Sequence, residues 1–228
     1  MNRAELSKRV TVILTEITRM TNTLYAINMA DVQRYPENYA ILARDAANRS
    51  EAIACRMRHL LYETSSMKKR DYLLSAADAQ NVSIVYHDEV LEITLPSLMP
   101  KRKRSQYPEF LLDPFTAALS QYTAEHALPQ FSSCVVCFCQ IYDRSLPERR
   151  IRDYDNVEFK QLLDVAAAYV LVDDSGQLCE LHCRTELGGE DCTKLFIMSG
   201  ERFPWWLMER QRKLAKSEIF NLENSAEK

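Results

Sequence analysis

The stretch that decides the fold and the site is Glu148-Arg149-Arg150-Ile151-Arg152-Asp153-Tyr154-Asp155-Asn156. Lys160 and Asp164 come after it, and a second acidic pair stands in Val172-Asp173-Asp174-Ser175. Carboxylate oxygens are hard ligands that hold divalent cations, and arginines attract a phosphate backbone. This order of basic and acidic residues therefore indicates metal-dependent chemistry on a nucleic acid.

The first part of the chain has the apolar period of long helices. Apolar residues recur in steps of four and three, which makes a heptad-like seam: Leu6, Val10, Ile13, Ile17, Met20, Leu24 and Ile27. Asn2 is suited to cap the first helix, and Pro36 to begin a second one that runs to about Glu63. We expect these helices to form an antiparallel hairpin, followed by a shorter helix over 68–79. Residues 1–80 would then serve as scaffold, as a dimer surface or as a binding site for a partner protein.

From Asn81 the period changes to that of strands alternating with helices. Strands are expected over 82–86, 90–95, 133–142, 177–185 and 193–198, and helices over 110–125, 159–168 and 205–220. The predicted fold class is therefore α+β. An N-terminal helical hairpin precedes a mixed α/β domain with a small central sheet over 81–200, and a helical tail occupies 201–228.

The composition is that of a soluble globular protein, with 46% hydrophobic and 27% charged residues among 228. The start lacks the apolar region of a signal peptide, and no apolar run approaches the ~20 residues of a membrane helix. We therefore expect a cytoplasmic protein with no membrane partner.

Charge is unevenly distributed along the chain. Residues 81–200 carry 11 Lys and Arg against 18 Asp and Glu, so bulk electrostatics disfavour non-specific DNA binding. The basic residues of this segment are nevertheless clustered, at Lys101, Arg102, Lys103 and Arg104 and at Arg149, Arg150 and Arg152. Such patches can bind a nucleic acid, and the alternative is that they are solvated loops.

Seven cysteines give an odd count, and we expect reduced thiols. Cys134, Cys137 and Cys139 have a spacing that suggests half a zinc site, but they lie in a strand-like run. On a strand, Cys137 and Cys139 share one face and Cys134 points to the other. Burial in the core is the preferred interpretation over zinc binding.

Residues 82–198, about half of the chain, resemble the RusA family of Holliday junction resolvases. The resemblance rests on the order strand, basic loop, helix, strand, Arg152-Asp153-Tyr154-Asp155-Asn156, helix and Val172-Asp173-Asp174-Ser175. It implies a Mg²⁺- or Mn²⁺-dependent, structure-specific endonuclease that acts on branched DNA in recombination and repair. It also implies a homodimer, because a resolvase cuts two symmetric strands. Carried over, the catalytic and metal-binding carboxylates are Asp153, Asp155 and Asp174, and the catalytic lysine is Lys160.

One spacing departs from the family pattern. The lysine lies four residues beyond the second aspartate in the family, whereas Lys160 lies five beyond Asp155. On a continuous helix one extra residue rotates a side chain by ~100°. Either this residue is absorbed in the loop near 156–158, or Lys160 points elsewhere.

Other interpretations remain open. Asp153 and Asp155 are also suited to cap the helix that follows them, and 173–176 has an ordinary turn composition. The alternative function is a catalytically silent DNA-binding or assembly protein of phage or mobile-element origin. A helical adaptor built on residues 1–80 is a third class.

Overall fold

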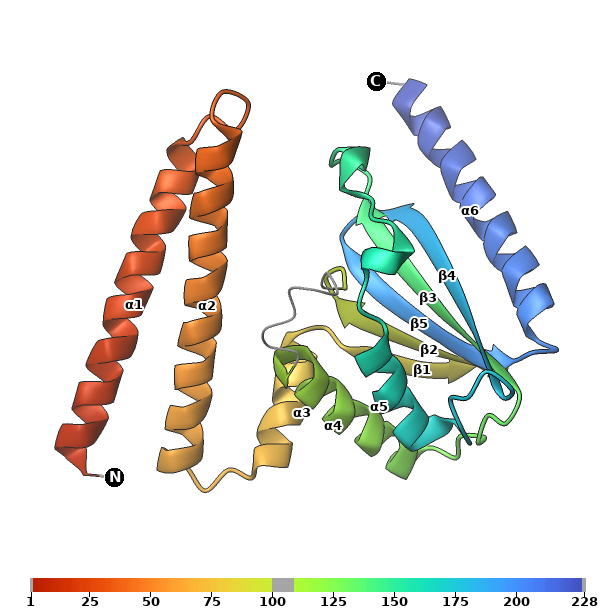
Figure 1. Ribbon diagram of the computed structural model, residues 1–228, viewed down its shortest axis with the longest axis horizontal. Helices are drawn as coiled ribbons and strands as arrows, with labels where there is room; N and C mark the ends of the chain where they lie inside the picture. Colours follow the sequence, from red (N-terminus) through yellow and green to blue (C-terminus); the bar gives the residue numbers. More distant parts are fainter. Residues whose placement is uncertain (1, 100–108, 227–228) are drawn as a thin grey trace. The chain divides into compact units, whose positions relative to one another are not determined.

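The computed structural model describes residues 2–99 and 109–226. The chain divides into two compact units, Met1–Tyr72 and Leu73–Lys228. The division falls within α3 (Lys69–Ala79), so the last part of this helix belongs to the unit that holds the sheet (Figure 1). The predicted α+β class, with helices first and a small mixed sheet after them, is confirmed.

The first unit is a helical hairpin of α1 (Arg3–Met29) and α2 (Pro36–Thr64). Asn2 caps α1 as expected: its side chain accepts from the amide of Glu5 at 2.9 Å, and the Glu5 carboxylate accepts from the amide of Asn2 at 3.1 Å. Pro36 occupies the first turn of α2, where its missing N–H costs nothing. Both predicted helix starts are therefore confirmed.

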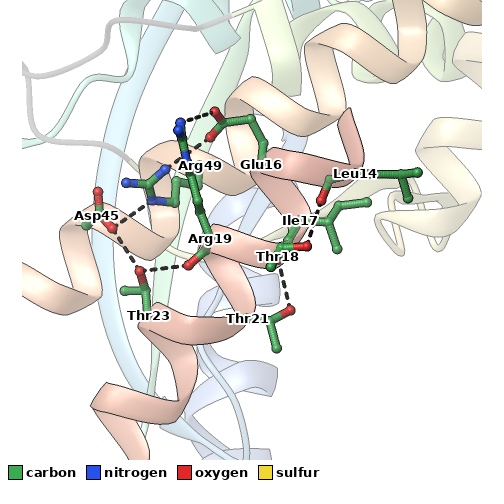
Figure 2. Close-up of polar contacts among 9 residues, drawn as sticks. All are labelled: Leu14, Glu16, Ile17, Thr18, Arg19, Thr21, Thr23, Asp45 and Arg49. Atoms are coloured by element: carbon green, nitrogen blue, oxygen red, sulfur yellow. Dashed lines mark hydrogen bonds and ion pairs between the residues drawn. The ribbon is translucent and has the colours of Figure 1, made fainter. Parts of the chain in front are cut away.

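A layer of polar groups joins the two helices (Figure 2). Arg49 of α2 pairs with Glu16 of α1 at 3.0 Å and with Asp45 at 2.8 Å, and Asp45 accepts from the Thr23 hydroxyl at 2.9 Å. The apolar residues that are buried in the described part of these helices are Ile13 and Ala46. The hairpin therefore has little core of its own.

The second unit is built on a five-stranded sheet with the order β1-β2-β5-β3-β4. Its strands are β1 (Ser83–His87), β2 (Val90–Pro96), β3 (Cys134–Asp143), β4 (Cys179–Gly188) and β5 (Cys192–Ser199). β3 and β4 pair in parallel, and the other pairs are antiparallel. Asp88 and Glu89 both have positive φ and form a two-residue turn between β1 and β2, a conformation that matches the twist of a hairpin.

Helices cover both faces of this sheet. α4 (Glu109–Glu125) and α5 (Lys160–Val170) pack on one face, where Phe115, Leu119 and Leu162 are completely buried. α6 (Phe203–Ala226) begins on the other face, where Trp206 packs on Phe196 with ring centroids 4.8 Å apart. The segment with the candidate site residues Asp153 and Asp155 follows the end of β3 and leads into α5, which packs on the sheet.

The cysteines of β3 are buried on opposite faces, as predicted. Cys134 belongs to the core beneath α4 and α5, and Cys137 and Cys139 belong to the core beneath α6. Burial raises the pKa of Cys137 to about 12, so this thiol is protonated at neutral pH. These three residues pack the sheet.

Candidate nucleic-acid and metal site

A cleft of about 700 Å³ lies along the stretch that opened the sequence analysis. Three segments form it: the residues after β2, the loop after β3, and the turn between β4 and β5. Its lining residues are Ser97, Leu98, Arg149, Arg150, Ile151, Arg152, Asp153 and Asp191. The cleft is therefore basic, with two carboxylates.

Arg150 is held by Asp191 and anchors the loop. Its guanidinium donates to both carboxylate oxygens, at 2.7 and 2.9 Å. Asp191 also accepts from the amide of Asp143 at 2.8 Å. These bonds, with that from Arg150 the strongest, hold the pKa of Asp191 below its usual range. The charges of this pair cancel, so Arg150 contributes position more than positive charge to the cleft.

Among the described residues, Arg149 and Arg152 form no ion pair of this kind, although the charge of Arg152 acts on Asp191. The Arg152 guanidinium donates to the carbonyl oxygen of Met99 at 2.7 Å, and its amide donates to the buried hydroxyl of Tyr142 at 3.1 Å. Arg149 is exposed. Within residues 2–99 and 109–226, no carboxylate forms an ion pair with either arginine. Three arginines against Asp153 and Asp191 leave the lining of the cleft with a net positive charge.

A buried polar network fixes residues 97–99, of which Ser97 and Leu98 line the cleft. The Gln140 side chain accepts from the amide of Met99 at 3.1 Å and donates to the hydroxyl of Thr193 at 2.9 Å. Thr193 in turn donates to the carbonyl of Ser97 at 3.0 Å. Gln140 and Thr193 are buried on neighbouring strands, β3 and β5, where they form a register pair. The sheet thus holds residues 97–99 in place. The basic run Lys101–Arg104, predicted to bind nucleic acid, lies outside the described residues.

Asp153 and Asp155 lie on either side of Tyr154, at a short 3-10 turn over 154–156. Both are exposed, and Asp153 lines the cleft. The Tyr154 hydroxyl lies 3.0 Å from that of Thr185 on β4. α5 begins with Phe159 at its N-cap and has no side-chain capping bond, so neither aspartate caps α5.

Lys160 is the first residue of α5, and 157–159 are not helical. The residues that directly precede Lys160 are therefore not part of α5. The ammonium bonds both carboxylate oxygens of Asp164 at 3.0 Å. These bonds, together with the charges of Asp164 and Asp174, raise the pKa of Lys160.

Asp174 does not line the cleft, and its segment meets the sheet near the other end of β3. It follows Leu171, which forms a bridge with Phe131 just before β3 begins, whereas Asp153 and Asp155 follow the end of β3. Its charge acts on Lys160 and on the Cys179 thiol. In the described part of the chain, no three His, Cys, Asp or Glu side chains gather closely enough to hold a metal ion.

The sequence alone did not point to Asp191, Gln140 or Thr193. Asp191 follows Gly188-Gly189-Glu190, which the sequence indicates only as a turn, and its partner lies 41 residues away. Of these three residues, Gln140 is the one that the sequence could have indicated. It is a polar residue in the apolar run of β3, and a buried polar side chain needs a hydrogen-bond partner.

The chain matches one protein family over nearly its whole length. A family model described as a family of unknown function (DUF6100) matches residues 2–222. The chain belongs to this family. The match covers both units, so the hairpin and the sheet unit are parts of one family architecture. A search of curated proteins finds no match. Among the described residues, no helix is long and apolar enough to cross a membrane.

Proposed function

We propose that the second unit is a metal-dependent endonuclease of the RusA type that binds the backbone of branched DNA along the cleft. The cleft carries this proposal: Arg149 and Arg152 line it without a carboxylate partner among the described residues, and the exposed Asp153 stands next to them. The resemblance of residues 82–198 to RusA resolvases supports the same assignment. Acting in the cytoplasm, such an enzyme would work as a homodimer, one copy for each strand that is cut.

The three arginines of the cleft have two roles in this proposal. Arg149 and Arg152 bind phosphates, which position the DNA without reading its sequence. Arg150, whose charge Asp191 neutralises, ties the loop after β3 to the turn between β4 and β5. Lys101, Arg102, Lys103 and Arg104 are further candidates for phosphate contacts in this proposal.

The carboxylates suit Mg²⁺ or Mn²⁺ by their chemistry. Mg²⁺ is commonly bound by one or two carboxylates and keeps several waters, so the exposed pair Asp153 and Asp155 is a sufficient donor set. When bound, the ion would polarise the scissile phosphate and lower the pKa of an attacking water. Asp174 would act as a third carboxylate or through its charge on Lys160. Lys160 would stabilise the extra negative charge of the transition state once it leaves Asp164, and a surface pair of this kind is weak.

Binding of a four-way DNA junction over a series of salt concentrations, without divalent ions, tests the cleft. Arg149→Ala should lower the slope of log K against log salt by about 1, one lost phosphate contact. The matched control is Arg212→Ala, an exposed arginine of α6, which should leave the slope unchanged. Equal slopes for wild type and Arg149→Ala would contradict the proposed DNA-binding role of the cleft.

A second candidate is a DNA-binding protein without turnover. It is favoured by the absence of a three-ligand group among the described residues and by the pairing of Lys160 with Asp164. Both candidates predict junction binding that depends on Arg149. Only the first predicts cutting that depends on a divalent ion.

A further inference from the structure

A second cleft, of about 350 Å³, borders the one described above. It is formed by the loop after β3, the last part of β4 and α6. Among the described residues, Ile151 is the one that lines both clefts. Its side chain therefore stands at the boundary between two hollows of the surface.

Both clefts have a lining with a net positive charge. The first has three arginines against two aspartates, and the second has Arg144 and Arg184 against Glu186. The Arg144 guanidinium donates to the carbonyl oxygens of Leu187 and Gly188, at 3.0 and 3.3 Å. These bonds orient the guanidinium without cancelling its charge. Each cleft can therefore attract a stretch of phosphate backbone.

The backbone around Ile151 is held on both sides. Its own amide donates to the carbonyl of Glu148 at 2.9 Å, and the next amide, that of Arg152, donates to the hydroxyl of Tyr142 at 3.1 Å. Tyr142 is buried on β3, and the preceding Arg150 is tied to the turn between β4 and β5. The Ile151 side chain is nevertheless 40% exposed. The loop thus presents an apolar side chain in a fixed position and does not bury it.

A single exposed apolar residue is ordinary on a protein surface. What distinguishes Ile151 is its place between Arg150 and Arg152 in the sequence and between two positively charged clefts in the fold. Proteins that open or kink DNA insert apolar side chains, isoleucine among them, between base steps. Because unstacking costs least where bases are already unpaired or displaced, such a side chain enters a branch point more easily than a continuous duplex.

We propose that Ile151 is a wedge that enters the branch point of the DNA, while the two strands that part there run along the two clefts. This inference rests on the proposed binding of branched DNA. The arginines bind the phosphates of any duplex, so the preference for a branched substrate comes from Ile151. It would touch the bases and take no part in the chemistry, which makes it a specificity-determining residue.

A four-way junction with 2-aminopurine at the branch point, studied without divalent ions, tests the wedge. The fluorescence of this base rises when it is unstacked. Saturating wild type should raise it at the branch point and leave it unchanged when the base lies within an arm. Ile151→Ala should lose the rise and bind the junction about five- to tenfold more weakly, because the side-chain carbons beyond Cβ are no longer buried between bases. Its affinity for linear duplex should not change.

Two further variants separate a wedge from a structural role. Ile151→Leu keeps an apolar side chain of the same size and should retain the rise and the affinity. Leu146→Ala is the matched control, because Leu146 is 44% exposed on the same loop and lines neither cleft, and it should behave as wild type.

The wedge is refuted if Ile151→Ala gives the wild-type rise and the wild-type preference for the junction, and that result leaves the nuclease proposal intact. Loss of the rise in Ile151→Leu as well would also refute it. A wild type that does not bind the junction would overturn both proposals. Junction binding with the rise but without metal-dependent cutting would contradict only the nuclease and would support the wedge.

Discussion

Replacing Thr193 by valine tests the network that holds the cleft wall. The hydroxyl is completely buried, accepts from Gln140 at 2.9 Å and donates to Ser97 at 3.0 Å. Valine has nearly the same shape, so the change removes these two bonds and little packing. The Gln140 amide is then buried without an acceptor, which costs ~1–3 kcal/mol, and the bond to the exposed Ser97 contributes a net ~0.5–1.5 kcal/mol. We expect a loss of about 2–4 kcal/mol in the free energy of unfolding.

Thr193→Ser is the matched control, because it keeps the hydroxyl and loses one methyl group. Its expected cost is about 1 kcal/mol. Urea unfolding of the two variants, with equal m-values, measures the difference. Junction affinity should also fall in Thr193→Val, because residues 97–99 lose their attachment to the sheet. If Thr193→Val is no less stable than Thr193→Ser, the buried network does not carry the energy assigned to it.

Two carboxylates give further predictions. The pKa of Asp191 is lowered in the folded state. The contribution of its ionised carboxylate to the free energy of unfolding is therefore present above the unfolded pKa of ~3.9 and is lost as pH falls through the lower folded value. In Asp191→Asn, the free energy of unfolding measured with urea should fall less steeply on the acid side. Glu186 is buried and bonded by Arg184 and Arg210, and Glu186→Gln should cost about 3–5 kcal/mol in thermal or urea unfolding, because two cations lose their buried partner. A change below ~1 kcal/mol, the size of a surface pair, would show that solvent already screens this cluster.

The helices and strands could be predicted from the sequence where one period of apolar residues continues over the whole element. The seam from Leu6 and the caps at Asn2 and Pro36 placed the hairpin, and alternation placed the strands. The end of α5 was less well predicted, because Tyr169 and Val170 continue the helix through an apolar run that fits a helix and a strand equally.

Pairings distant in sequence could not be predicted from it. Nothing local indicates that β5 enters between β2 and β3. The Arg150–Asp191 pair exists only because this strand order brings two turns together. The heptad pattern also does not show which seam residues stay exposed, and Leu6, Ile17 and Leu24 do.

The candidate catalytic residues come from the RusA resemblance, and the description of the cleft beside them comes from the structure. The order of motifs pointed to Asp153, Asp155, Asp174 and Lys160. The structure adds a basic cleft next to Asp153 and places Asp174 near the other end of β3. Whether these carboxylates act together stays a prediction that a functional assay decides.

The most direct test of the central claim is single-turnover cleavage of a labelled four-way junction with Mg²⁺ or Mn²⁺, with linear duplex as the competing substrate. Wild type should cut the junction selectively and only with the metal. Asp155→Asn and Asp174→Asn should bind it and cut ~10²-fold more slowly or not at all, as expected when one electrostatic group is lost, while Asp173→Asn, the adjacent exposed control, should cut like wild type. Cutting by Asp155→Asn at the wild-type rate, or binding by wild type without metal-dependent cutting, would contradict the account.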